Sequence, residues 1–130
     1  MPNVGSDLLF APAVELAALI HKRELSPVEL MRTTLARIEA VNPRLNALVS
    51  LRPAEELLAE AQVMADRLAR REDIGALAGM PLAVKDLEDA VGLPTTHGSL
   101  LFKGVYPERD TIQVERLKRD PHLEMHTRGG

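Results

Sequence analysis

The spacing of apolar residues along the chain predicts helices that alternate with two short strands. Apolar residues recur every three or four positions in three ranges before residue 72 and in one range after residue 110. We expect helices over 6–23, 27–41, 53–71 and 111–118. Branched apolar residues in alternation predict a strand over 45–51, and the run 78–84, apolar on both faces, predicts a covered parallel strand. This order of elements is typical of the α/β class.

The second helix has the clearest boundaries. Ser26 stands at its N-cap, Pro27 occupies the first helical position, and Glu29 completes a capping box. We expect Asn42-Pro43 to stop this helix. Ser6-Asp7 can cap the first helix, but Pro12 lies inside that range, so the helix begins at one of these two places.

Residues 86–109 predict a long loop, because glycine and proline recur through it. A structureless loop of this length is functional or disordered. Two strands cannot form a covered parallel sheet by themselves, so the pattern predicts an incomplete sheet. The edges of 45–51 and 80–84 would then be exposed, which predicts self-association through strand edges.

Composition excludes several classes of function. The net charge is −3 and the basic residues form no extended cluster, which argues against a nucleic-acid partner and against an anionic membrane. The absence of cysteine excludes disulfides and thiolate metal sites and fits a reducing compartment. The apolar stretch 8–20 contains Pro12 and Glu15 and is too short to cross a bilayer. We expect a soluble, cytoplasmic chain without a cofactor.

The apolar run 78–84 is followed at once by a lysine, Lys85. Burial disfavours the charged form of a lysine, so an amine desolvated at the end of a covered strand could be neutral and accept a proton. The alternative is an edge lysine paired with Asp86 or Glu88 at the surface. From the strand alone, this surface alternative is the favoured interpretation.

The residues on both sides of Lys85, taken together, favour the interpretation as a base over the surface alternative. "LAGMPLAVKDLEDAVGLPTTHGS" (77–99) resembles the opening motif of the amidase signature family, with Leu-Ala-Gly, an apolar strand, Lys-Asp, and a Gly-Leu-Pro-Thr-Thr loop that ends in Gly-Ser. "RIEAVNPRLNALV" (37–49) and "RDTIQVERLK" (109–118) are also similar to that family. The resemblance covers most of 10–118. His97 departs from it, because a small residue is more usual there, and its bulk could alter the packing of the loop.

The resemblance implies the fold and the chemistry. It implies an N-terminal fragment of the amidase signature fold, with several helices around an incomplete mixed or parallel sheet. Enzymes of this family hydrolyse the C–N bond of a carboxamide through a Ser–cis-Ser–Lys triad, and their substrates include small-molecule amides. Lys85 matches the triad lysine, which acts through the cis-serine on the nucleophilic serine, while backbone N–H groups stabilise the oxyanion.

The nucleophile of that triad has no counterpart among the serines of this chain, which are Ser6, Ser26, Ser50 and Ser99. No two of them are adjacent, and none lies in a glycine-rich turn. Ser6 and Ser26 are expected to cap helices, Ser50 to end a strand, and Ser99 to form loop hydrogen bonds. We therefore expect a truncated amidase that is inactive alone. The alternatives are a non-catalytic interaction module and one half of a complemented amidase.

The last residues, "RDPHLEMHTRGG", show no strand pattern where the resemblance predicts a strand. We expect an amidase-like domain over 1–118 and an unrelated, disordered tail over 119–130. With permissible codons, a one-nucleotide shift over 122–128 partly restores a family-like segment, which suggests a frameshift that the nucleotide sequence would test.

The histidines do not form a recognisable metal motif. His122, Glu124 and His126 have the wrong spacing for a His-Glu-x-x-His zinc site, so a polar tail is the favoured interpretation and no metal site is expected. His21 is expected at the end of the first helix, where a cation is favourable.

Overall fold

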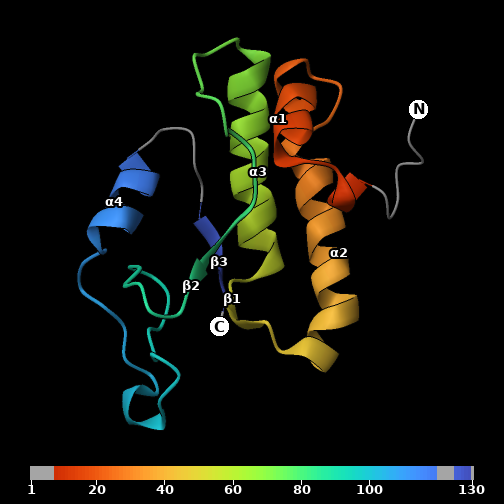
Figure 1. Cartoon of the computed structure of the whole chain (residues 1–130). Helices are drawn as coiled ribbons and strands as arrows, with labels where there is room; N and C mark the ends of the chain where they lie inside the picture. The colour runs from red at the N-terminus through yellow and green to blue at the C-terminus, as the bar shows by residue number, and fades with distance from the viewer. Residues whose placement is uncertain (1–7, 120–124, 130) are drawn as a thin grey trace.

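In the computed structural model, residues 8–119 and 125–129 are described. The elements in chain order are η1 (Leu8–Phe10), α1 (Ala13–His21), α2 (Pro27–Leu45), β1 (Leu48–Leu51), α3 (Ala54–Ala69), β2 (Leu82–Lys85), η2 (Leu100–Phe102), α4 (Ile112–Arg119) and β3 (Met125–Gly129). The strands form a mixed sheet of order β1-β3-β2, in which β3 runs antiparallel to β1 and parallel to β2. Figure 1 shows α1–α3 on one side of the molecule and the 86–109 loop with α4 on the other. The predicted α/β class with an incomplete mixed sheet is confirmed.

Helix α2 begins as the sequence predicts and ends later than it predicts. The Ser26 hydroxyl accepts a hydrogen bond from the Val28 N–H at 3.2 Å, and Pro27 is the first helical residue. The prediction that Asn42-Pro43 stops this helix is wrong, because α2 continues to Leu45. Termination is set instead by Asn46, which takes the left-handed conformation (φ 49°) while its N–H donates to the Asn42 carbonyl at 2.7 Å.

Asn42 also fixes where β1 begins. Its side-chain amide donates to the Leu48 carbonyl and its side-chain oxygen accepts from the Leu48 N–H, both at 2.9 Å. One side chain therefore replaces a pair of strand hydrogen bonds at the start of β1. Because this link closes the turn 46–47, the strand is shorter than the predicted 45–51.

Helix α1 begins after Pro12, which is the later of the two predicted starts, and ends at His21, two residues before the predicted end at residue 23. Ser6 and Asp7 lie outside the described residues. The apolar faces of α1, α2 and α3 pack together with the turn that precedes β2. Ile20 and Leu57 have no exposed surface, and Leu30 and Met64 are 1% exposed. Gly79 (φ 79°) lets this turn approach α2 closely, because a Cβ there would lie 2.8 Å from Cγ of Pro27. The helical region thus has a closed core of its own.

A second, smaller cluster lies between β2, the loop and α4. Leu82 and Val84 pack there with Ala90 and Leu93 from the loop and with Val114 from α4. Strand β2 begins at Leu82 rather than at residue 78, because Ala78 and Met80 form turn hydrogen bonds to Gly75 and Leu77. Residues 78–81 therefore belong to the turn that closes the helical core.

The C-terminal residues depart from the sequence prediction. The backbone of Met125–Gly129 forms strand β3 and pairs with both β1 and β2. The expectation that residues 119–130 contain no strand is wrong for 125–129. The reason is tertiary, because an extended backbone between β1 and β2 satisfies the hydrogen bonds of both strands whatever its side-chain pattern. The domain boundary at 118 stays a prediction.

Candidate active site beside Lys85

Lys85 is the last residue of β2, and the chain turns sharply after it. The N–H of Glu88 donates to the Lys85 carbonyl at 3.0 Å, which closes the turn at the carboxyl end of the strand. A cavity of about 320 Å³ lies beside Lys85. Its walls come from β1 through Val49, from the turn through Leu87, and from the loop through Thr96, His97 and Gly98. The lysine therefore stands where strand, turn and loop meet.

The expectation that β2 is covered on both faces is wrong for the described residues. Val84 is buried, whereas Ala83 and Lys85 are exposed. Leu82 and Val84, on one face of β2, pack with apolar residues of the loop and of α4. The Lys85 side chain is consequently solvent-accessible rather than desolvated, and the ion pairs found within the described residues do not include it. Its proposed role as a base stays a prediction.

The neighbouring residue, Asp86, holds the loop in place. Asp86 is 5% exposed, and its carboxylate accepts hydrogen bonds from the Thr96 N–H at 2.8 Å and from the Thr96 hydroxyl. Such charge-assisted bonds are stronger than bonds between neutral groups. They tie the turn after Lys85 to a residue ten positions later, so that Thr96 and its neighbours form a wall of the cavity. The sequence did not identify Asp86 as an anchor, although the Lys-Asp and Thr-Thr pairs are both part of the 77–99 motif.

His97 is accommodated by a left-handed backbone and an aromatic contact. Its φ is 52°, a conformation in which histidine is found more often than most residues, and Gly98 follows with φ 70°. The rings of His97 and Phe102 meet edge to face, with centroids 5.3 Å apart. The bulk of His97 is thus used to pack the loop against η2.

Two further hydrogen bonds attach the loop to the start of α4. The Asp110 carboxylate accepts from the Val91 N–H at 2.7 Å, and the Thr111 N–H donates to the Asp89 carbonyl at 2.9 Å. They bring the start of α4 beside the first half of the loop. Val114 can therefore reach the small apolar cluster under β2.

The serines occupy structural positions. Ser26 caps α2, and the Ser99 hydroxyl accepts from the Leu101 N–H at 3.3 Å at the start of η2, so both expectations are confirmed. Ser50 lies within β1 rather than at its end. Ser99 is not among the residues that line the Lys85 cavity. Ser6 lies outside the described residues.

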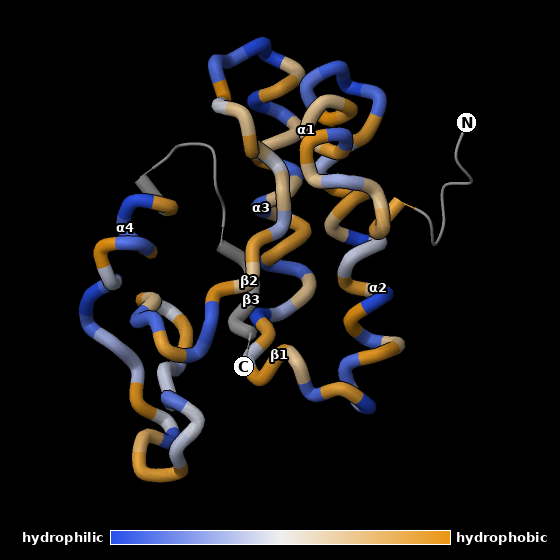
Figure 2. The backbone as a smooth tube through the Cα atoms, viewed as in Figure 1, coloured by the Kyte–Doolittle hydropathy of each residue, from blue (hydrophilic) through white to orange (hydrophobic). Residues whose placement is uncertain are grey.

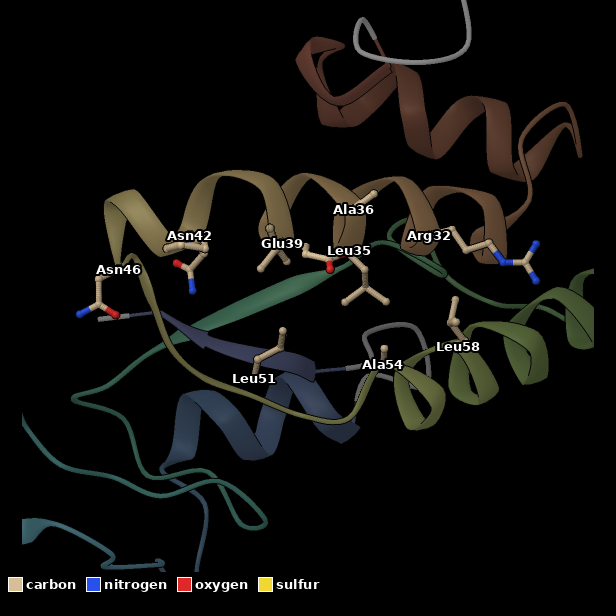
Figure 3. Close-up of a pocket in the computed structure, with 11 residues that line it drawn as sticks. Arg32, Leu35, Ala36, Glu39, Asn42, Asn46, Leu51, Ala54 and Leu58 are labelled. Carbon is tan, nitrogen blue, oxygen red and sulfur yellow. The ribbon is translucent and has the colours of Figure 1, made fainter.

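A second hollow among the described residues lies away from Lys85. A groove of about 790 Å³ lies between α2, β1 and the start of α3, and Figure 3 shows Leu35, Leu51 and Leu58 around it. Its Asn42 is already used in holding β1. Within the described residues, no group of histidine and acidic side chains is suited to a metal ion, and no helix is long and apolar enough to cross a membrane. His122 and Glu124 lie outside those residues.

The resolved pKa shifts belong to surface ion pairs away from Lys85. The hydrogen bond to Glu60, at 2.6 Å, raises the pKa of Arg52, and Glu56 adds to this effect. Hydrogen bonds from Arg67 and Arg70 lower the pKa of Glu72, which lies just after α3. These pairs stabilise the ends of α3 and have no contact with the cavity.

Comparison with known sequences identifies relatives along most of the chain. The Amidase family model matches residues 29–122. A glutamyl-tRNA(Gln) amidotransferase subunit from Acidothermus cellulolyticus is 42% identical over 113 residues, which are 87% of this chain and 22% of that protein. The corresponding subunit from Bdellovibrio bacteriovorus is 39% identical over 87% of this chain and 23% of its own length. The chain spans less than a quarter of these relatives.

Solved structures agree with the sequence relatives. The peptide amidase of Stenotrophomonas maltophilia superposes with a TM-score of 0.80 and 31% identity, over 92% of this chain and 24% of that one. A bacterial aryl acylamidase of the amidase signature family superposes with a TM-score of 0.83 over 96% of this chain and 26% of its own; at 24% identity it supports the fold alone. From the family match and the shared fold, this chain belongs to the amidase signature family.

Proposed function

We propose that this chain contributes the lysine of an amide-hydrolysing site and that its 130 residues do not hydrolyse amides by themselves. The observation that carries the proposal is the position of Lys85, within the family motif, at the carboxyl end of β2 and beside a cavity with walls from three elements. In the family reaction that the motif implies, the lysine receives the proton of a serine through the cis-serine. The nucleophilic serine then attacks the carboxamide carbon, the amine leaves with a proton, and water releases the acid.

The exposure of Lys85 supports the proposal that this chain does not hydrolyse amides by itself. An amine that is to act as a base needs a serine relay against it, and desolvation would favour its neutral form. The described residues do not desolvate the amine, because the face of β2 that carries Ala83 and Lys85 is open. They also place no serine in the lining of the Lys85 cavity. The missing cover and the missing serines would come from the same additional polypeptide, either joined to these residues or bound to them.

The substrate class is a carboxamide, and no metal ion or cofactor is needed for this chemistry. The names of the relatives, one from an amidotransferase and one a peptide amidase, support this class. We place the protein in the cytoplasm, in keeping with its cysteine-free sequence. Among the described residues, the outer edges of β1 and β2 are free for further strand pairing in the β1-β3-β2 sheet, so the isolated chain is expected to self-associate through them.

The test is an assay with a panel of aryl amides. We expect no product above background from the 130-residue chain. We expect hydrolysis when residues 8–119 replace the matching quarter of the Stenotrophomonas peptide amidase, so that the amidase contributes its serines. In that chimera Lys85→Ala should abolish turnover, whereas the matched control Lys22→Ala, an exposed lysine after α1, should leave it unchanged.

Three results would contradict the proposal. Turnover by the isolated chain that Lys85→Ala removes would show that these residues suffice for catalysis. A folded chimera with full activity in the Lys85→Ala variant would remove the lysine from the mechanism. A folded chimera without any activity would favour a non-catalytic interaction module.

A further inference from the structure

The loop after Lys85 ends in an apolar hairpin, defined here as residues 95–106. Its ends are joined by the hydrogen bond from the Thr95 N–H to the Val105 carbonyl at 3.0 Å. Figure 1 shows the hairpin projecting away from α1–α3, with η2 at its outer end. The element is remote from the closed core of the helical region.

The hairpin has a defined conformation. Ser99 caps η2, and the Val105 N–H donates to the Phe102 carbonyl at 3.1 Å. Gly98 and Gly104 take positive φ values of 70° and 76°, which reverse the chain on either side of η2. The Asp86–Thr96 bonds hold the base of the hairpin against the turn after Lys85. An ordered element that displays side chains in this way is already shaped for a partner.

The displayed side chains are apolar. Leu100 is 88% exposed, Leu101 90% and Tyr106 63%, and Phe102 and Val105 are also exposed. Figure 2 shows the hydrophobic colour at the outer end of the loop. Lys103 is the only lysine, arginine or acidic residue between 95 and 106. Adjacent exposed apolar side chains with so little charge are typical of a surface that another polypeptide covers.

The comparisons indicate what covers it. The family match, residues 29–122, includes the whole hairpin. The peptide amidase that superposes on 92% of this chain has about three quarters of its length outside the superposed part. We infer that the hairpin is a docking surface for the part of an amidase domain that lies outside this matched segment. The inference deepens the proposed function, because the serine-bearing segment would belong to that same partner.

The experiment compares the hairpin in two contexts by thermal unfolding. The double variant Leu100→Ser/Leu101→Ser is made in the full 130-residue chain and in the peptide amidase chimera described above. In the isolated chain the exposed leucines contribute little, so the Tm should stay within roughly 2 °C of the parent. In the chimera the leucines would be buried, so the Tm should fall by roughly 5–10 °C.

The matched control is Val14→Ser/Val63→Ser, which removes two apolar side chains that are exposed on α1 and α3. It should have little effect in either context. Equal shifts for the hairpin variant and this control in the chimera would overturn the inference. So would a chimera that stays insoluble while the parent amidase folds under the same expression conditions.

Sedimentation of the 130-residue chain tests a different occupant of the hairpin. Self-association that Leu100→Ser/Leu101→Ser abolishes would show that a second copy covers the hairpin, which would also overturn the inference. Self-association that persists in this variant agrees with pairing through the strand edges instead. Because unfolding and sedimentation do not depend on hydrolysis, a folded chimera without activity would overturn the proposed function and leave the docking result intact.

Discussion

The helical region, α1–α3, and the loop region, residues 86–119, are held together by different interactions. In the helical region large side chains such as Ile20, Leu30 and Leu57 are almost entirely buried. In the loop region the buried apolar set is small, and the Asp86 and Asp110 carboxylates fix the backbone by accepting N–H bonds. The loop region therefore keeps a defined shape while leaving apolar side chains exposed.

This difference indicates how the two regions are used. A region whose stability comes from packed side chains can form a scaffold without help. A region that depends on a few hydrogen bonds and ends in an apolar hairpin is better suited to presenting a site and receiving a partner. Lys85 stands at the junction, with the scaffold on one side and the anchored loop on the other. The predictions that follow test this division.

The largest expected effect comes from the core of the helical region. Leu57 is completely buried between α2 and α3, so Leu57→Ala should lower the free energy of unfolding by about 2–5 kcal/mol through lost burial and a residual cavity. Val63→Ala, on the exposed side of the same helix, is the control and should cost less than about 0.5 kcal/mol. Urea unfolding followed by circular dichroism at 222 nm measures both. Similar costs for the two variants would refute a closed helical core.

An intermediate effect is expected from the loop anchor. Asp86→Ala removes the acceptor for both Thr96 donors and should cost about 1–3 kcal/mol. The loss should be local, because the helical core does not use these bonds. Amide hydrogen exchange should therefore accelerate at Thr96 while protection in α3 is retained.

The control for the loop anchor is Glu88→Gln, which alters a neighbouring acidic side chain and should leave exchange at Thr96 unchanged. If Asp86→Ala instead reduced protection in α3 as much as at Thr96, the two regions would unfold as one unit. The contrast between scaffold and anchored loop would then be lost.

The smallest effect is electrostatic and depends on pH. Arg67 and Arg70 lower the pKa of Glu72, so the folded state favours its ionised form. The associated stability is present above pH 4.5, the ordinary glutamate pKa, and is lost as the pH falls through the lower folded-state value. Glu72 is exposed, so this contribution is small.

The measurement compares Glu72→Gln with the parent chain in urea at pH 6 and at pH 3. The variant should be slightly less stable at pH 6, and the difference should be smaller at pH 3, because the carboxylate begins to protonate as the pH falls. Glu55→Gln, at the start of α3 and outside the Arg67–Arg70 cluster, is the control. An undiminished difference at pH 3 would show that packing rather than charge accounts for the role of Glu72.

The family, the main helices and the motif around Lys85 could be predicted from the sequence because each depends on neighbouring residues. Helical periodicity and the Ser26-Pro27 start are local signals, and the start of α2 was predicted correctly. The 77–99 motif led to the family that the comparisons then confirmed. The end of α2 was predicted wrongly, because Asn46 and the Asn42–Leu48 link compete with the local signal of Pro43.

Only the tertiary structure decided the exposure of Lys85, the anchoring role of Asp86 and the pairing of β3. Each depends on groups that lie far apart in sequence, such as Asp86 and Thr96, or residues 125–129 between β1 and β2. Apolar residues in the run 78–84 indicate that burial is favourable, but they do not say which other segment provides it. Burial is a property of both contacting surfaces, so one face of β2 is covered by the loop and α4 while the face of Lys85 stays open.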